Sequence, residues 1–291
     1  METALRQLYQ DRASEENTYA ILVLEKEHLP LSMTDGFDAI ILLITHNPDV
    51  DWYVKHYNVN KNRIAFHTLS QDVMHHSLIA GNQRRLVHWL VRGKIVFDRN
   101  EFLQGVKERI ETFPPGDRSK KMTIQFAKML RRFEEGKILF QQCHFFDAYS
   151  NLLHALHHLA RLAVIYHGYY PETTVWQQMK KIEPETYKLY EELLKSEEGL
   201  EKRIELLILT MELAIHSKTE VGSDHFLSLL RLRQANWSIS EIMELQEIEN
   251  YKVDVELLLS FLIDKQIIIE EYRHSKAPGI EHLRYRVSTS L

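Results

Sequence analysis

The fold of this chain is decided by the stretch Thr34-Asp35-Gly36-Phe37-Asp38-Ala39-Ile40-Ile41-Leu42-Leu43-Ile44. Two carboxylates and a glycine precede an apolar run in which β-branched residues recur. A short apolar run that follows turn residues is typical of a buried strand. Carboxylates at the start of such a strand can hold a divalent metal ion beside a phosphate group. The stretch therefore predicts a strand over residues 37–45, with Asp35 and Asp38 as candidate catalytic residues and metal ligands.

The composition indicates a soluble protein of two or three domains. The chain has 291 residues, and its 36 basic and 41 acidic side chains give a formal net charge of −5. That balance offers no general attraction to nucleic acid or to anionic membranes. No apolar stretch approaches the length of a membrane span, and the N-terminus lacks the pattern of a signal peptide. Cys143 is the only cysteine, which excludes an internal disulfide and a cysteine-based zinc site. We therefore expect a cytoplasmic protein with no membrane partner.

Three segments of different texture predict three domains, at residues 1–116, 117–217 and 218–291. The first segment mixes strand and helix signals and ends in a Pro-Pro-Gly-Asp cluster, which is the clearest boundary in the chain. Its patterns predict strands over 18–24, 37–45, 63–69 and 94–98, and helices over 72–80, 83–91 and 101–112.

The other two segments are mainly helical. Apolar spacing in the second predicts an up-and-down bundle with helices over 122–140, 146–166, 183–194 and 199–216. The third has the order of a winged helix, with helices over 225–234, from 238 and over 254–264, then strands over 266–272 and 282–287. The predicted fold class is α+β: a mixed-sheet domain followed by a helical bundle and a small winged-helix-like domain.

The first domain resembles the nucleotidyltransferase domain of the polymerase-beta superfamily. In that family one strand ends in Gly-Ser, the next carries Asp-x-Asp, and a later strand carries a third Asp. The resemblance implies that the Gly-Ser turn binds nucleotide phosphates and that the three carboxylates hold two magnesium ions for attack on the α-phosphate.

The chain departs from this pattern at its first two positions. The first strand ends in Glu25-Lys26 where the family has Gly-Ser. Glycine lets a phosphate group come close to the backbone, whereas the acidic Glu25 side chain would repel it. Asp35 and Asp38 are three residues apart, and on a strand such residues face opposite sides. The two can converge only if Asp35 lies in the turn before the strand. Asp38 fits one family position, and Gly36 or Ile40 occupies the other.

The third carboxylate is also missing. The strand over 63–69 contains none; His67 is its only ligand-capable side chain, and Asp72 follows in the next turn. An alternative needs no ligand, with Asp35 and Gly36 forming a turn and Asp38 capping the strand. The residues that the resemblance implies are Asp35, Asp38 and Asp72 as ligands of Mg²⁺, and Gly36 and His67 as nucleotide-binding residues.

The helix over 146–166 carries a cluster of histidines. His154, His157, His158 and Arg161 share one helical face, and His154 and His158 have the spacing of zinc ligands on a helix. The candidates for a third ligand are Asp147, His144 and His216. Histidines packed inside the bundle explain the same pattern, and this interpretation is favoured.

The predicted bundle resembles the helical domains of kanamycin-transferase-type proteins and HEPN domains. Active HEPN ribonucleases carry Arg and then, after four to six residues, His near a helix end. Arg161 and His167 fit that spacing, and the resemblance implies roles on the phosphate and in the attack of the 2′-hydroxyl. A histidine at a helix C-terminus is also favoured by the helix dipole alone. If the domain instead closes over an acceptor substrate, the aromatic candidates to line the cleft are Tyr166, Tyr169, Tyr170 and Trp176.

Charge argues against DNA as a partner of the third domain. Residues 218–291 carry nine Lys and Arg against twelve Asp and Glu, a net charge of −3. The helix at the recognition position, over 254–264, has the pattern of a buried helix. A basic wing remains an alternative, formed by Arg273, His274, Lys276, Arg284 and Arg286. Docking to a protein is the favoured use of this domain.

Four functions follow from these patterns. The favoured one is a nucleotidyltransferase-like protein whose degenerate site is inactive and binds a nucleotide or a protein partner, with no cofactor. The first alternative is an active Mg²⁺-dependent nucleotidyltransferase that uses Asp35 and Asp38. The second is a regulatory protein that acts through its winged helix, and the third is a HEPN-type ribonuclease.

Overall fold

The computed structural model describes residues 2–26, 34–47, 49, 51–81, 83–233, 235–274 and 279–288. The chain divides into two compact units, Met1–Phe113 and Pro114–Leu291. In the part of the chain described, no helix is both long enough and apolar enough to cross a membrane.

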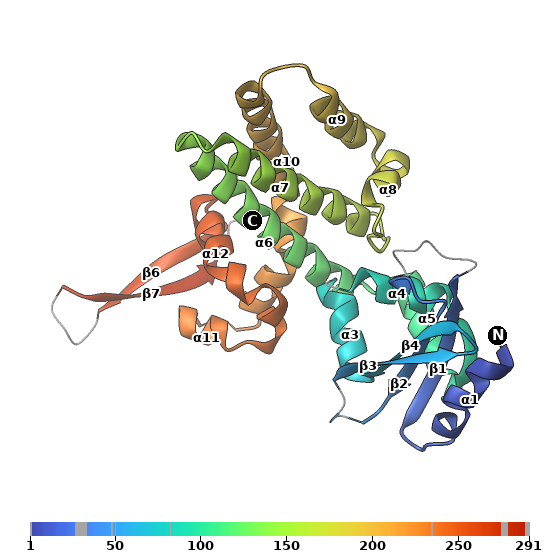
Figure 1. The fold of residues 1–291 in the computed structure, drawn as a ribbon. Coiled ribbons are helices and arrows are strands. Elements are labelled where there is room, and N and C mark those ends of the chain that lie inside the picture. The colour runs from blue at the N-terminus through green and yellow to red at the C-terminus, as the bar shows by residue number, and fades with distance from the viewer. Residues whose placement is uncertain are drawn as a thin grey trace. The chain divides into compact units, whose positions relative to one another are not determined.

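A five-stranded mixed sheet forms the centre of the first unit, with strand order β3-β4-β2-β1-β5 (Figure 1). Its central strands β2 and β4 pair in parallel, and the other neighbours pair antiparallel. The strands are β1 (Thr18–Glu25), β2 (Ala39–Thr45), β3 (Trp52–Val59), β4 (Asn62–Ser70) and β5 (Lys94–Asp98). Every residue of β2 is buried, as expected for a continuous apolar run between two covered faces.

Helices cover both faces of this sheet. Leu5 of α1 (Glu2–Ala13) packs with Ile21, Ile41 and Phe66 on one face. On the other face, Gly93 at the end of α4 approaches Leu22. The helices that follow the central strands are α3 (Gln71–Ala80), α4 (Arg84–Arg92) and α5 (Phe102–Thr112), with the short 3₁₀ helix η2 (Arg99–Glu101) before the last.

Two elements of this unit were not predicted from sequence, helix α1 and strand β3. β3 is an edge strand whose residues are exposed or half-buried, so it lacks the apolar alternation that marks a strand in a sequence. Its pairing with β4, from Trp52 beside Leu69 to Val59 beside Asn62, comes from backbone hydrogen bonds. The four predicted strands are all present.

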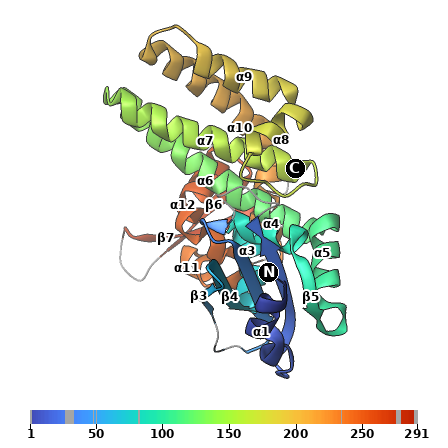
Figure 2. The ribbon, with the colours of Figure 1, turned by 45° about the vertical axis from the view of Figure 1, so that its right-hand side comes forward.

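Three long helices, α6 (Pro115–Gln141), α7 (Phe145–Tyr166) and α10 (Leu200–Leu230), pack against one another in the second unit (Figures 1 and 2). Two shorter helices, α8 (Val175–Ile182) and α9 (Pro184–Lys195), connect α7 to α10. α6 begins earlier than its apolar pattern predicted, because Pro115 is at the first turn, where a missing N–H costs nothing.

Helix α10 corrects one prediction. Residues 199–216 and 225–234 were expected as two helices, but Leu200–Leu230 is a single helix of 31 residues that runs through the predicted domain junction at residue 217. Gly222 lies inside this helix and does not interrupt it. A side chain there would collide with Phe126 of α6, because an added Cβ would lie 2.4 Å from the Phe126 Cγ. The glycine is therefore required by close helix packing and does not mark a helix end.

The C-terminal part of this unit is a helix-turn-helix with a hairpin. α11 (Ile239–Met243), the 3₁₀ segment η3 (Gln246–Asp254) and α12 (Val255–Asp264) are followed by β6 (Ile268–His274) and β7 (Glu281–Val287). Trp237 pairs with Tyr285 as an isolated bridge, which adds a third short extended segment to the hairpin. The buried Asp254 forms an ion pair with Arg131 of α6, which joins this part to the bundle.

We predict opposite effects on stability for two glycine substitutions. Gly222→Ala should lower the free energy of unfolding by about 1–3 kcal/mol, because the methyl group overpacks a contact with a fully buried Phe126. Gly105→Ala, inside α5 with no atom near the added Cβ, should raise it by about 0.4–1 kcal/mol. Urea unfolding of the two variants measures both; a Gly222→Ala protein as stable as wild type would contradict the close contact between α6 and α10.

Candidate functional site

A pocket of about 310 Å³ opens beside the central strands of the first unit. Side chains from β2, β3 and β4, from the turn before β2 and from the start of α4 line it. They are Thr34, Asp35, Phe37, Ile40, Trp52, Val54, His56, Ala65, His67, Gln83 and Arg85. Pockets of this size that combine aromatic and a few polar groups are the usual form of a small-molecule site.

Aromatic side chains in contact form one wall of this pocket. Trp52 Nε1 donates a hydrogen bond of 3.1 Å to His67 Nδ1, and the His67 ring lies 4.8 Å from the ring of Trp89. Burial, helped by the nearby positive charge of Arg85, lowers the pKa of His67 to about 4. The ring is therefore neutral near pH 7, and because Nδ1 accepts from Trp52, its proton is on Nε2.

The polar side chains of the pocket come from the turn before β2. Asp35 has a positive φ of 49° and Gly36 one of 79°, and this turn directs the Asp35 carboxylate into an ion pair with Arg85. Thr34 is fully buried, and its hydroxyl has no hydrogen-bond partner among the described residues. A buried hydroxyl without a partner costs free energy, so a ligand that bonded to it would recover that cost.

Asp38, just before β2, bonds to the backbone of the neighbouring strand β4. Its carboxylate accepts a hydrogen bond of 2.9 Å from the Arg63 backbone N–H and lies 3.7 Å from Lys26 Nζ. The next residue on the same face of β2 is Ile40, which is 2% exposed and lies beside Ala65 of β4 in the parallel register. Two apolar side chains, Ile40 and Ala65, thus lie side by side on the wall of the pocket.

The structure brings only some of the predicted metal and nucleotide residues together, with Asp35 and His67 lining one pocket. Asp35 and Asp38 have separate partners, Arg85 and the Arg63 N–H, while Asp72 is in the first turn of α3. Within the described ranges, no three or more His, Cys, Asp or Glu side chains are arranged to hold a metal ion. His67 lines the pocket, and Gly36 contributes the left-handed backbone of the turn.

Comparison with known proteins places the whole chain in one family. Family models match three consecutive parts: a nucleotidyltransferase-like model residues 1–118, a YgxA-like substrate binding domain residues 119–218, and a helix-turn-helix domain residues 224–287. YgxA of Bacillus subtilis (strain 168) is 38% identical over 285 residues, which cover 98% of this chain and 97% of the relative. The crystal structure of a nucleotidyltransferase-like protein from Exiguobacterium sibiricum 255-15 superposes with a TM-score of 0.87 at 40% identity, over 99% of both chains.

This chain belongs to the YgxA-like family of nucleotidyltransferase-like proteins. The resemblance seen in the sequence of the first domain is therefore confirmed, as are the α+β class and the helix-turn-helix nature of the C-terminal part. The pocket beside β2 and β4 lies in the part of the YgxA-like protein that matches the nucleotidyltransferase-like model.

Two histidines of α7 in this YgxA-like protein, His157 and His158, are engaged in packing, whereas His154 is exposed. His158 Nδ1 is 2.9 Å from Gln125 Oε1 of α6, and burial, with a contribution from Arg161, lowers the pKa of His158 to about 3. Trp176 Nε1 donates to His157 Nδ1 at 3.1 Å. Both histidines are thus neutral or bonded within the bundle, as the packing interpretation expects.

The Arg161 and His167 pair lacks a common face. His167 caps the end of α7, where its Nε2 lies 3.1 Å from Glu183 Oε1. Arg161 is six residues earlier, which on a helix turns it well away from His167, and it is near the buried His158. HEPN-type chemistry stays a prediction that this geometry does not favour.

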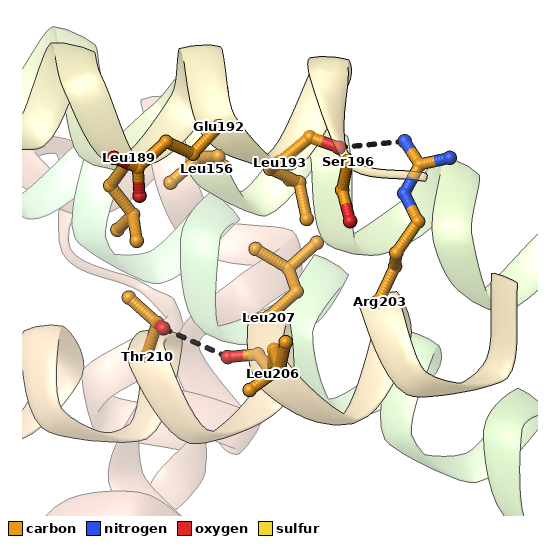
Figure 3. A pocket seen from close by; sticks show the side chains of 9 residues that line it. All are labelled: Leu156, Leu189, Glu192, Leu193, Ser196, Arg203, Leu206, Leu207 and Thr210. Atoms are coloured by element: carbon orange, nitrogen blue, oxygen red, sulfur yellow. Dashed lines mark hydrogen bonds between the residues drawn. The ribbon is translucent and has the colours of Figure 1, made fainter. Parts of the chain in front are cut away.

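A second pocket, of about 350 Å³, lies within the bundle between α7, α9 and α10 (Figure 3). The residues that line it are Leu156, Leu189, Glu192, Leu193, Ser196, Arg203, Leu206, Leu207 and Thr210. Sequence reasoning missed this pocket, because leucines at helical spacing on three helices have the same pattern whether they enclose a filled core or a space. The only distinctive signal was a single arginine among them.

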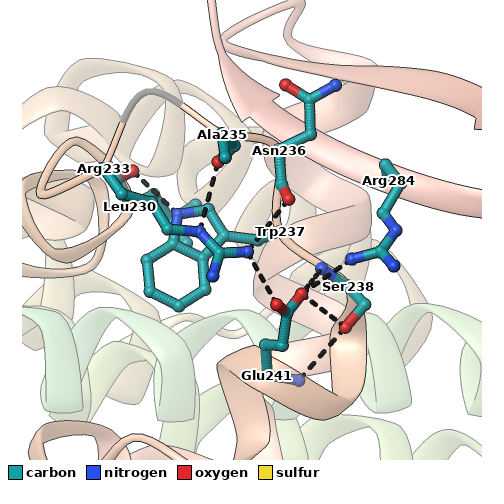
Figure 4. Close-up of polar contacts among 8 residues, drawn as sticks. All are labelled: Leu230, Arg233, Ala235, Asn236, Trp237, Ser238, Glu241 and Arg284. Atoms are coloured by element: carbon teal, nitrogen blue, oxygen red, sulfur yellow. Dashed lines mark hydrogen bonds and ion pairs between the residues drawn. The ribbon is translucent and has the colours of Figure 1, made fainter.

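Two arginines of the C-terminal hairpin in this YgxA-like protein, Arg284 and Arg286, are paired. Glu241 accepts from the N–H and hydroxyl of Ser238 at the start of α11, and it forms ion pairs with Arg233 and Arg284 at 3.0 and 2.7 Å (Figure 4). These hydrogen bonds, those from Ser238 first, lower the pKa of Glu241 to about 2. Arg286 is paired in the same way, with Glu271 of β6.

Of the other residues of the predicted basic wing, Arg273 is exposed on β6. His274 Nδ1 lies 3.2 Å from Glu281 Oε1, and Lys276 lies outside the described residues. On α12, at the recognition position, the exposed side chains Glu256, Ser260 and Asp264 recur every four residues and so share one face. That face is acidic, which opposes contact with phosphates.

We predict that His67 makes stability depend on pH. The pKa of folded His67, about 4, is below its ordinary value of 6.5, so the unfolded chain binds more protons between these values. The contribution of neutral His67 to the free energy of unfolding is complete above pH 6.5 and is lost as the pH falls towards 4. Its size should be about 1–3 kcal/mol.

Urea unfolding of wild type and His67→Gln across this pH range tests the prediction. The difference between the two proteins should shrink as the pH falls, whereas His154→Gln, which replaces an exposed histidine, should follow wild type throughout. A pH-independent difference between wild type and His67→Gln would contradict the neutral state of the ring.

Proposed function

We propose that this protein is a catalytically silent nucleotidyltransferase-like protein whose first domain binds a nucleotide. The observation that carries the proposal is that Ile40, one of the two residues that can occupy the family's second Asp position, is buried and pairs with the apolar Ala65 of β4. Apolar side chains cannot coordinate Mg²⁺, which prefers hard oxygen ligands. The proposed binding therefore needs no metal ion.

The contacts of the two carboxylates near this position, Asp35 and Asp38, also support the proposed lack of transferase activity. Asp38 bonds to the Arg63 N–H and Asp35 to Arg85, so coordination of a metal ion would first break a charge-assisted contact at each. At the end of β1, Glu25-Lys26 provides no glycine for close approach of a triphosphate to the backbone.

The pocket has the chemistry of a nucleotide site without a metal. Aromatic rings such as that of Trp52 stack with any nucleobase, and the neutral His67 offers an N–H donor from Nε2. Thr34 offers a hydroxyl, and Arg85 lines the same pocket as a cation for a phosphate. Asp35 competes for that cation, so the site favours a nucleotide with a small negative charge.

We predict binding without transfer. Titration calorimetry with nucleoside monophosphates should give the same affinity in Mg²⁺ and in EDTA. Trp52→Ala should weaken binding about tenfold or more, through the lost stacking. Asp35→Asn should strengthen it severalfold, because it removes the anion that pairs with Arg85 and because asparagine tolerates a positive φ.

Tyr53→Ala is the matched control, since Tyr53 is the next residue of β3, is exposed and does not line the pocket. If wild type transferred label from an α-labelled nucleoside triphosphate in Mg²⁺ and Asp38→Asn did not, the proposal that the site is catalytically silent would be wrong. Absence of nucleotide binding by wild type at millimolar concentration would contradict the proposal that the ligand is a nucleotide.

A second function is favoured for the C-terminal domain, docking of a protein partner. The support comes from charge: Arg284 and Arg286 are paired with Glu241 and Glu271, and the exposed face of α12 is acidic. A regulatory role would then act through a protein surface. We also infer a cytoplasmic location, in keeping with the exposed and unpaired Cys143.

We predict that the domain does not retain DNA. Mixed-sequence duplex DNA at 50 mM salt should show no gel shift with wild type, because the helix presents carboxylates to the phosphates. The variant with Glu256→Lys, Ser260→Lys and Asp264→Lys should gain a shift that disappears as salt is raised. A salt-sensitive shift by wild type that is lost on neutralising Arg284 would reverse the assignment.

A further inference from the structure

Helix α9 covers the bundle loosely. None of its twelve residues is buried, although it carries Leu189 and Leu193 on the side that lines the pocket shown in Figure 3. An amphipathic helix normally buries its apolar face against its neighbours. Here the space below that face is the pocket of about 350 Å³.

The walls of this pocket are mainly aliphatic. Leu156 of α7 and Leu207 of α10 are almost fully buried below it, and α9 supplies the opposite wall. If each non-hydrogen atom takes about the share of one water, ~30 Å³, the space holds roughly a dozen atoms. An aliphatic lining favours an apolar ligand, because filling the space restores dispersion contacts to the leucines.

Arg203 is the cation of the pocket. Its Nη2 donates to the Tyr149 hydroxyl at 2.6 Å and to the Leu193 carbonyl at 2.7 Å, and both acceptors are neutral. Arg203 is half-buried, and among the described residues its Nε has no hydrogen-bond partner and no carboxylate pairs with its guanidinium. A guanidinium that is partly removed from water and lacks an anion keeps an uncompensated charge, which a bound carboxylate would neutralise.

Other polar side chains of the pocket do not neutralise this cation. Thr210 Oγ1 donates to the Leu206 carbonyl at 2.8 Å, and Ser196 Oγ accepts from the Glu198 N–H at 3.2 Å. Glu192 is the one acidic residue of the lining, and its side chain is exposed, so solvent screens its charge. The pocket thus has a half-buried positive end and an aliphatic body.

We propose that this pocket binds a small amphipathic carboxylate, with the carboxylate paired to the guanidinium of Arg203 and an aliphatic chain of about eight to ten carbons among the leucines. The shape and charge of the site together specify this class. A neutral chain would leave Nε without a partner, and a cationic head group would be repelled by the guanidinium. The inference is independent of nucleotide binding, since it concerns side chains of the bundle alone.

Titration calorimetry with decanoate tests the proposal on the full-length protein. Decanoate should bind, while decan-1-ol should bind at least tenfold more weakly and decyltrimethylammonium not at all. Arg203→Met should weaken decanoate binding at least tenfold and leave decan-1-ol unchanged. Glu192→Gln, which removes the acidic residue of the lining, should retain binding.

A steric variant keeps the test decisive if Arg203→Met folds poorly, because Arg203 also contacts Tyr149 and Leu193. Leu206 is 51% exposed, so Leu206→Trp should be tolerated and should fill the pocket, which abolishes decanoate binding. Leu213→Trp, on the same helix at 75% exposure and outside the lining, is the matched control and should bind normally. Equal affinity for decanoate and decan-1-ol, or decanoate binding unchanged by Leu206→Trp, would overturn the proposal.

Discussion

The parallel register of β2 and β4 places Ile40 beside Ala65, and much of the first domain depends on this pairing. Both strands are buried at these positions, so a slip of one residue would turn the apolar side chains of β2 to the wrong faces. The same register brings Asp38 next to Arg63, where its carboxylate bonds to the backbone. The pairing that makes the sheet stable therefore also determines which side chains are left to line the pocket.

Charged side chains held in ion pairs are found in both units. Asp35 is paired with Arg85 in the first unit, and Glu241 with two arginines near the hairpin in the second. Such pairs remove free charges from surfaces that would otherwise attract phosphates or DNA. Arg203, whose described contacts are to neutral oxygens, differs from this pattern, and that difference is what makes the bundle pocket chemically specific.

Local pattern predicted the buried elements well and the exposed ones poorly. β2 and α12 were predicted because continuous or periodic apolar residues mark burial directly. β3 was missed because an edge strand depends on backbone pairing with its neighbour, which leaves little trace in side-chain order. α10 was predicted as two helices, whereas the structure has one helix in which Gly222 packs against Phe126 of α6, a contact between segments far apart in the chain. The same limit applies to the pockets, whose walls come from segments far apart in the chain.

The sequence by itself determined the α+β class, the order of its three parts and the departure of the first domain from its family's acidic pattern. Those properties depend on residue identity and short-range periodicity. Only the tertiary structure decided that Asp35 and Asp38 have separate partners, that Trp52 and His67 form a wall of one pocket, and that Arg203 lies at the end of another. The physical reason is that hydrogen bonds and ion pairs act over a few ångströms in space, between residues whose separation along the chain carries no information about their contact.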